Sequence, residues 1–180
     1  MPKAVINDQY INYEIAGVRD FKLRTPALLL HGNGESMKVF AGLVSILASS
    51  RGFVLMDSRY QGGSSPAVEG LVPHISYELM ADDALKLMED ELGVAEYDII
   101  GSSDASIKNA VPTDLSRILN KAPIERIYAN GSTAEKLYLK YQQPLTGRDI
   151  TRLPSTSPAN AAWSAARLAE QWRLDLLETA

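Results

Sequence analysis

The chain contains no cysteine and only two histidines, His31 and His74. The absence of cysteine excludes disulfides, thiol catalysis and thiolate metal sites, and it fits a reducing cytoplasm, where we expect the protein to be located. Two histidines are too few for a multi-histidine metal site. We therefore expect neither a metal nor another cofactor.

Long apolar runs are also absent. No segment approaches the roughly 20 apolar residues that a transmembrane helix needs. Residues 1–5 lack the basic segment, followed by an apolar one, that begins a secretory signal. We therefore expect no membrane partner. The 180 residues, of which 46% are hydrophobic and 22% charged, are typical of one soluble globular domain or at most two small ones.

Charge is unevenly distributed along the chain. Residues 1–97 contain 8 Lys and Arg against 13 Asp and Glu, whereas residues 98–180 contain 10 against 9. The formal net charge of −4 argues against strong nonspecific DNA binding, because phosphate neutralisation supplies most of that affinity. The nearly neutral second part leaves room for a local basic face.

Strand-like and helix-like patterns alternate along the whole chain. Short apolar or alternating runs predict strands at residues 10–15, 27–30, 53–56, 97–100, 124–129 and 149–153. Apolar residues at helical spacing predict helices at residues 39–47, 75–92, 113–119, 132–141 and from about 160 to 177. This alternation predicts an α/β fold with three layers, in which helices cover both faces of a parallel sheet.

Three strand ends in the first 105 residues carry polar, glycine-containing turns. They are residues 31–34, 57–65 and 101–105, the last of which reads G-S-S-D-A. Together with the helix expected at residues 76–92, these turns resemble the N-terminal half of an α/β-hydrolase. There they would be the oxyanion turn, the D-x-R-G-x-G-x-S loop and the G-x-S-x-G nucleophile elbow. Tyr60 replaces one glycine of the loop motif.

This resemblance implies a site for a small ester or amide substrate. Ser103 would be the nucleophile, and the backbone N–H groups of Asn33 and Asp104 would polarise the substrate carbonyl. The triad of this family runs Ser, then Asp or Glu, then His, but no histidine follows Ser103. Because a serine without a base is a weak nucleophile, the resemblance implies weak or no esterase activity.

A second set of motifs occupies residues 98–114, 128–135 and 153–160. In this order they resemble the C-terminal half of a member of the uracil-DNA glycosylase superfamily. The branch that they resemble most removes hypoxanthine (deoxyinosine) from DNA. Such enzymes extrude a base from the duplex and hold it in a pocket, so this resemblance implies DNA as a partner.

The second resemblance also implies roles for particular residues. Asn109 would contact the base or orient a water molecule, which makes it the candidate catalytic residue. The residues that would contact the base or the DNA backbone are Asn130, Gly131, Ser155, Ser157 and Asn160. From the residues alone the alternatives are ordinary, because Asn109 could be a turn former and Asn160 a helix cap.

The two resemblances divide the chain into a hydrolase-like part (residues 1–97) and a glycosylase-like part (residues 98–180), each incomplete relative to its parent family. Three functions remain open: an esterase-like hydrolase, a DNA-deoxyinosine glycosylase of base-excision repair, and a catalytically inert hybrid domain. The apolar helix faces of the first part would lack their usual partners. We therefore also expect exposed apolar patches and self-association.

Overall fold

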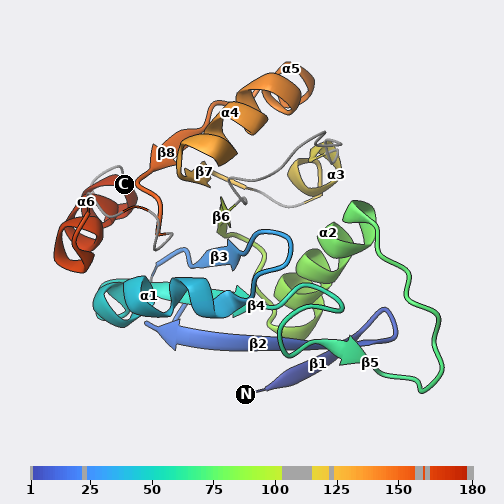
Figure 1. Cartoon of the computed structure of the whole chain (residues 1–180). Helices are drawn as coiled ribbons and strands as arrows, with labels where there is room; N and C mark the ends of the chain where they lie inside the picture. Colours follow the sequence, from blue (N-terminus) through green and yellow to red (C-terminus); the bar gives the residue numbers. More distant parts are fainter. Residues whose placement is uncertain are drawn as a thin grey trace.

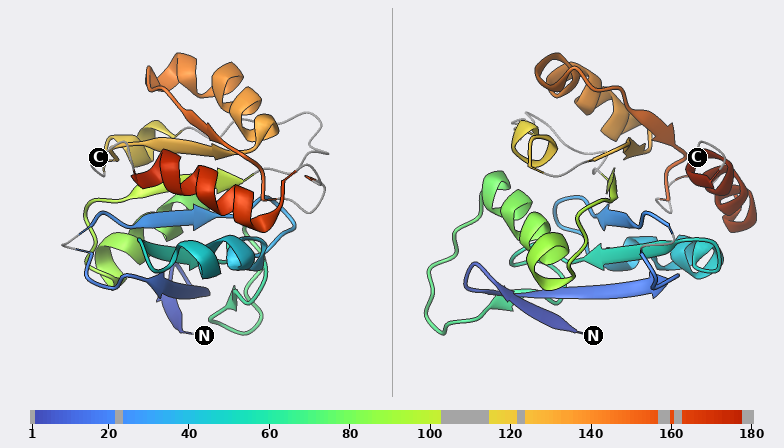
Figure 2. Two further views of the ribbon diagram at one scale, coloured as in Figure 1. Left: turned by 90° about the vertical axis from the view of Figure 1, so that its left-hand side faces the viewer. Right: turned by 180° about the vertical axis from the view of Figure 1, so that it is seen from behind.

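The computed structural model describes residues 2–21, 24–102, 115–121, 124–156, 160 and 163–177. Its strands form one sheet that lies between two layers of helices (Figure 1 and Figure 2). The order of neighbouring strands is β1-β2-β4-β3-β6-β7-β8, and β5 pairs with β2. Strands from the hydrolase-like part and the glycosylase-like part therefore belong to the same sheet.

The strands are β1 (Lys3–Ile6), β2 (Gln9–Gly17), β3 (Ala27–Leu30), β4 (Gly52–Met56), β5 (Ser65–Pro66), β6 (Asp98–Ser102), β7 (Ile127–Asn130) and β8 (Thr151–Leu153). The α-helices are α1 (Ala41–Leu47), α2 (Tyr77–Lys86), α3 (Ser116–Leu119), α4 (Ser132–Tyr141), α5 (Gln143–Thr146) and α6 (Ala165–Leu177). A 3₁₀ turn, η1 (Met37–Phe40), precedes α1, and a π-helical turn, η2 (Leu87–Glu91), extends α2.

The first two strands add antiparallel pairs to the predicted parallel sheet. β1 and β2 form an antiparallel hairpin, whose turn residues Asn7 and Asp8 have φ angles of 46° and 60°. A tight turn of this kind can join only antiparallel strands. β2 also pairs antiparallel with β4, whereas the pairs from β4 to β8 are parallel. The α/β prediction is thus confirmed, with a sheet that is mixed and mostly parallel.

The predicted helix at residues 75–92 is present but divided. α2 begins after Ser76, whose Oγ accepts a hydrogen bond from the N–H of Leu79 at 3.2 Å. The helix passes into η2 and stops before Gly93, which has a φ of 63° and fits a helix C-terminus. β7 is shorter than predicted, because its pairing with β6 begins only at Ile127. The predicted start of α3 at residues 113–114 lies outside the described residues.

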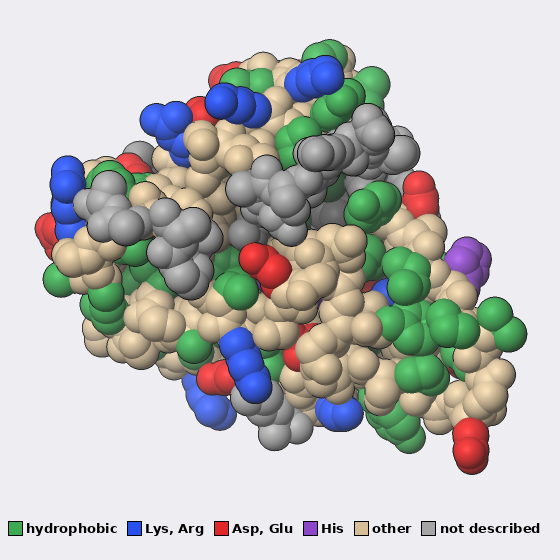
Figure 3. Space-filling view, viewed as in Figure 1, with side chains coloured by type: hydrophobic (Ala, Val, Ile, Leu, Met, Phe, Trp, Pro, Cys, Tyr) green, Lys and Arg blue, Asp and Glu red, His purple; other side chains and the backbone are tan. Residues whose placement is uncertain are grey.

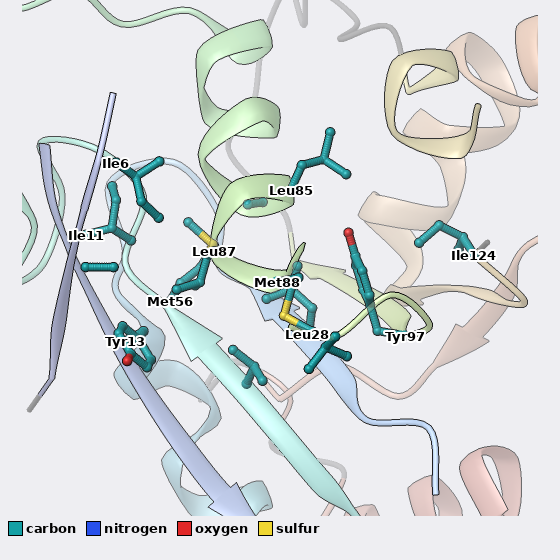
Figure 4. Packing of buried hydrophobic residues seen from close by; sticks show 14 of the residues in the cluster. Ile6, Ile11, Tyr13, Leu28, Met56, Leu85, Leu87, Met88, Tyr97 and Ile124 are labelled. Carbon is teal, nitrogen blue, oxygen red and sulfur yellow. The ribbon is translucent and has the colours of Figure 1, made fainter. Parts of the chain in front are cut away.

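One core lies between the sheet and the layer that contains α2. Ile11 and Tyr13 of β2 and Met56 of β4 pack there against Leu85 of α2 and Leu87 of η2 (Figure 4). The same cluster extends to α4 and to the segment before β7. It therefore draws on both parts of the chain.

The opposite face of the sheet is covered by α1 and α6, which lie side by side (Figure 1 and Figure 2). Trp172 of α6 is fully buried and belongs to one cluster with Phe40, Leu43 and Leu47. Its indole N–H donates to the carbonyl oxygen of Pro154 at 2.9 Å. The expectation that the helices of the first part lack apolar partners is thus wrong for α1, because α6 covers its apolar face.

Candidate functional site

The parallel strands end together at one edge of the sheet. Leu30 of β3 lies opposite Met56 of β4 and Gly101 of β6, and Ser102 of β6 lies opposite Asn130 of β7. The loops that follow these residues therefore gather at this carboxyl edge, where open parallel sheets commonly bind ligands. The predicted site residues that the structure describes lie at or just beyond these strand ends.

Several predicted site residues cannot be placed. Ser103, Asp104, Asn109 and Ser157 lie outside the described residues, although β6 ends one residue before Ser103. The predicted site residues that the structure does describe are Asn33, Asn130, Gly131, Ser155 and Asn160. Asn33 follows β3, and the other four form a separate group at the end of β7 and after β8.

Asn33 lies in the exposed turn after β3, whose other N–H groups are engaged. Gly32 N–H donates to Glu35 Oε2 and Gly34 N–H donates to Gln61 Oε1, each at 2.9 Å. Gln61 Nε2 in turn donates to Asn33 Oδ1 at 3.1 Å. Within the described part of the chain, Asn33 N–H has no acceptor. Its role as a donor to a substrate oxygen stays a prediction.

His31 is buried at the start of this turn, and both of its ring nitrogens are engaged. Ser58 N–H donates to Nε2 at 3.0 Å, so the ring proton resides on Nδ1, which donates to Gly32 O at 2.7 Å. Both ring nitrogens of His31 are therefore used to hold the turns after β3 and β4. His74 is exposed in the loop before α2, where its backbone carbonyl accepts from Arg59.

Asp57 organises the loops that follow β3 and β4. Its carboxylate accepts hydrogen bonds from Met37 N–H at 2.7 Å, from Gly63 N–H at 2.7 Å and from Asn12 Nδ2 at 2.8 Å. Burial by itself raises the pKa of Asp57, but the N–H groups of Gly63 and Met37 and the Asn12 amide together lower it below the ordinary 3.8. The carboxylate is therefore ionised at neutral pH and holds both loops in place.

Two positions in the loop after β4 have a left-handed backbone. Gly62 has a φ of 56°, and a Cβ there would lie 2.3 Å from Asp57 Cγ, so glycine is required. Tyr60 has a φ of 59° at the position where the hydrolase motif has glycine. This conformation costs a tyrosine roughly 1–2 kcal/mol. Its hydroxyl oxygen accepts a hydrogen bond at 3.0 Å from the buried side chain of Gln9, which offsets part of that cost.

Arg59 connects the same loop to α2. Its guanidinium donates from Nε and Nη2 to the two carboxylate oxygens of Asp83 at 2.7 and 2.8 Å, and both side chains are buried. Asn7, in the turn between β1 and β2, donates to Asp83 at 2.9 Å and to Asp82 at 3.0 Å. This network could not be predicted from the sequence, because it joins residues that are far apart in the chain and leaves no local pattern.

The described residues of the glycosylase-like motifs also meet at the carboxyl edge. Asn130 is buried, and its amide is engaged at both ends: Nδ2 donates to Thr156 Oγ1 at 2.8 Å, and Thr156 N–H donates to Oδ1 at 3.0 Å. Gly131 has a φ of 95°, and a Cβ there would lie 3.0 Å from Ser155 Cβ. Asn160 Nδ2 donates to Ser155 O at 2.8 Å. The two bonds to Thr156 fix the orientation of the Asn130 amide and leave one N–H and one oxygen lone pair of that amide unused by Thr156.

The groups that the described carboxyl edge offers are backbone N–H donors, carboxamides and the Asp57 carboxylate. The described residues include no group of three or more His, Asp or Glu side chains that could hold a metal ion. None of the helices that the structure describes is both long and apolar enough to cross a bilayer.

Comparison with solved structures identifies the fold. An α/β hydrolase, MGS-M2, from a Medee basin deep-sea metagenome library aligns with 71% of this chain at 25% identity and a TM-score of 0.54. The enol-lactonase from Burkholderia xenovorans LB400 aligns with 71% at 21% identity and a TM-score of 0.52. The haloalkane dehalogenase DbeA from Bradyrhizobium elkani USDA94 aligns with 71% at 21% identity and a TM-score of 0.50. No family model and no curated protein matches the chain.

The protein therefore has a partial α/β-hydrolase fold. The aligned region covers 42%, 45% and 39% of the three solved chains, so this chain spans less than half of their length. Since 71% of 180 residues is more than the 97 residues of the hydrolase-like part, the hydrolase likeness continues into the second part. These structures lend no support to the glycosylase resemblance.

Proposed function

We propose that this protein is an α/β-hydrolase-like domain that acts on a small ester or amide, with Ser103 as the nucleophile. The hydrogen bonding of the turn after β3 is the observation that supports this function. Glu35 and Gln61 occupy the N–H groups of Gly32 and Gly34, while Asn33 N–H has no acceptor among the described residues. β3 is the direct neighbour of β6, whose end precedes Ser103.

In the proposed reaction, Ser103 Oγ bonds to the carbonyl carbon, and the carbonyl electron pair moves onto oxygen, where Asn33 N–H donates to it. Collapse re-forms the C=O bond and breaks the bond to the leaving group, which takes a proton from water and departs as the alcohol or amine. Water then hydrolyses the acyl-serine that remains. No histidine follows Ser103, and both nitrogens of His31 are engaged. Ser103 therefore loses its proton to solvent, and we expect slow acylation that accelerates as the pH rises.

The test is acylation by p-nitrophenyl acetate, followed by intact-mass and peptide mass spectrometry. We expect one acetyl group on Ser103, faster labelling at higher pH and no labelling of this peptide in Ser103→Ala. Ser45→Ala is the matched control, because Ser45 is an exposed serine on α1. Acetylation that is spread over lysines and unchanged in Ser103→Ala would contradict the proposed function.

A second candidate is a DNA-deoxyinosine glycosylase in which Asn109 acts on the base. The observation that favours it is the contact between the Asn130 and Thr156 side chains, which joins two glycosylase-like motifs at the carboxyl edge. Hypoxanthine release from an inosine-containing duplex, lost in Asn109→Ala, would replace the esterase proposal. If neither reaction occurs, the inert hybrid domain is the alternative that remains of the three.

We also propose self-association through an apolar patch on the segment between β5 and α2. Hydrophobic side chains gather at the right-hand side of the face shown in Figure 3. The large exposed apolar residues of this segment and of the start of α2 are Val68, Leu71, Val72, Ile75 and Tyr77. Sedimentation at increasing protein concentration tests the proposal, and Val72→Ser, which changes the most exposed of these residues, should weaken any association.

A further inference from the structure

One carboxamide connects the loop after β4 to the turn after β3. Gln61 Oε1 accepts from Gly34 N–H at 2.9 Å, and Gln61 Nε2 donates to Asn33 Oδ1 at 3.1 Å. A single side chain thus contacts two consecutive residues of the turn, one through its backbone and one through its side chain. Asn33 N–H, the proposed donor to the substrate oxygen, belongs to the peptide unit that directly precedes the one held by Gln61.

The backbone of Gln61 is itself held on both sides. Its N–H donates to Ser58 O and its carbonyl accepts from Ser64 N–H, each at 3.0 Å. The same loop is anchored by the bond from Gly63 N–H to Asp57 at 2.7 Å. The carboxamide therefore extends from a fixed loop onto an exposed turn, which is the arrangement that a positioning side chain requires.

Other contacts do not duplicate this role. Glu35 accepts from Gly32 N–H, at the beginning of the turn, and Asp57 accepts from Met37 N–H beyond its end. Gly34 itself has a φ of 79°, and nothing lies within 4 Å of the position that its Cβ would occupy. Gln61 is thus the described side chain that restrains the exposed middle of the turn.

We infer that Gln61 is the positioning residue of the oxyanion turn: its bonds to Gly34 N–H and Asn33 Oδ1 set the orientation of the Asn33 N–H. This inference rests on the proposed hydrolase function. Gln61 need not touch the substrate. Its removal should leave the fold intact and slow the step in which negative charge develops on the carbonyl oxygen.

The experiment compares Gln61→Ala with the wild-type protein by amide hydrogen exchange and by Ser103 acetylation. We expect Gly34 N–H to exchange about tenfold faster and acetylation to slow about tenfold, in line with the loss of one hydrogen bond. Gln143→Ala is the matched control, since this glutamine makes one exposed bond to Asp149. The thermal midpoints of both variants should stay at the wild-type value.

Gln61→Glu separates the two contacts of this side chain. A carboxylate still accepts from Gly34 N–H but cannot donate to Asn33 Oδ1. We expect wild-type exchange at Gly34 and an acetylation rate between those of the wild type and Gln61→Ala. The inference is overturned if Gly34 exchange is unchanged in Gln61→Ala, or if exchange accelerates while acetylation keeps its wild-type rate. If the wild type is never acetylated, the proposed function fails, and Gly34 exchange alone decides whether Gln61 holds the turn.

Discussion

Two buried aspartates lie at opposite edges of the same sheet, and different kinds of group stabilise their negative charges. Asp57 follows β4 at the carboxyl edge, and its partners are backbone N–H groups and the neutral amide of Asn12. Asp98 opens β6 at the amino edge, and its partners are the guanidinium groups of Arg51 and Arg126. Asp57 is 2% exposed and Asp98 0% exposed, so burial does not distinguish them.

The two arrangements serve different purposes. At the amino edge, Arg51 from the hydrolase-like part reaches Asp98 and also the carbonyl oxygen of Leu176 in α6, so the ion pair joins the two parts of the chain. Asp98 Oδ1 and Arg51 Nε have no hydrogen-bond partner among the described residues. At the carboxyl edge, both oxygens of Asp57 accept hydrogen bonds from loops. The amino edge therefore contributes cohesion, whereas the carboxyl edge positions the candidate site.

Arg51→Met should produce the largest loss of stability. The substitution keeps an apolar stem in the core but removes a cation from the buried carboxylate of Asp98. Breaking a buried ion pair on one side typically costs about 3–5 kcal/mol of unfolding free energy. Because Arg126 still pairs with Asp98 in this variant, we expect a loss near the lower end of that range. Urea unfolding at neutral pH measures this loss.

Arg173→Met is the matched control, because Arg173 pairs with an exposed glutamate on the surface of α6. Its unfolding midpoint should stay close to that of the wild type. If Arg51→Met and Arg173→Met lowered the unfolding free energy by the same amount, the Arg51–Asp98 pair would not hold the two parts of the chain together.

Gly62→Ala should have the next largest effect and act on the carboxyl edge alone. A Cβ at this position would lie 2.3 Å from Asp57 Cγ on a backbone with a φ of 56°. The strain and the displaced carboxylate together should cost about 3 kcal/mol. Gly34→Ala separates these contributions, because its φ is 79° but its Cβ meets nothing within 4 Å. We expect Gly34→Ala to cost about 1 kcal/mol of unfolding free energy. An equal cost for Gly62→Ala would mean that the added Cβ does not displace the Asp57 carboxylate.

Much of the fold could be predicted because its elements leave local patterns. β3 and β4 are continuous apolar runs, and the ends of the helix that begins with α2 follow from Ser76 and Gly93. β5 and α5 have two and four residues, too few for any period to be recognised. The antiparallel hairpin of β1 and β2 also has a local signal in the sequence, because Asn7 and Asp8 are residue types that tolerate the positive φ of a tight hairpin turn.

The site was predictable only as far as strand ends and motif resemblance allow. They placed Asn33 and the loop that starts at Asp57 on the carboxyl edge. The contact from Gln61 to Gly34 spans 27 positions, and the contact from Tyr60 to Gln9 spans 51. Such pairs follow from the tertiary fold and leave no mark on the local sequence. The sequence alone therefore gives no reason for a tyrosine at position 60, where the motif has glycine. The tertiary structure gives one, because the Tyr60 hydroxyl accepts a hydrogen bond from Gln9.

Asp57→Asn should have a smaller effect than Arg51→Met or Gly62→Ala, and it isolates the charge of the carboxyl edge. An asparagine offers one oxygen and one NH₂ group, so its NH₂ must face at least one N–H donor that now bonds to the carboxylate. Loss of charged hydrogen bonds of this kind should cost about 2 kcal/mol at neutral pH. Asp149→Asn is the control, because Asp149 is exposed and accepts from Gln143.

The pH dependence of that loss decides whether charge is the cause. The pKa of Asp57 in the folded protein lies below 3.8, so its ionised form stabilises the fold above this value. The contribution disappears as the pH falls through the lowered pKa. The difference in unfolding free energy between the wild type and Asp57→Asn should therefore be constant from about pH 7 to about pH 5 and shrink toward about pH 3. A difference that persists unchanged into acid would show that the shape of the side chain, rather than its charge, holds these loops.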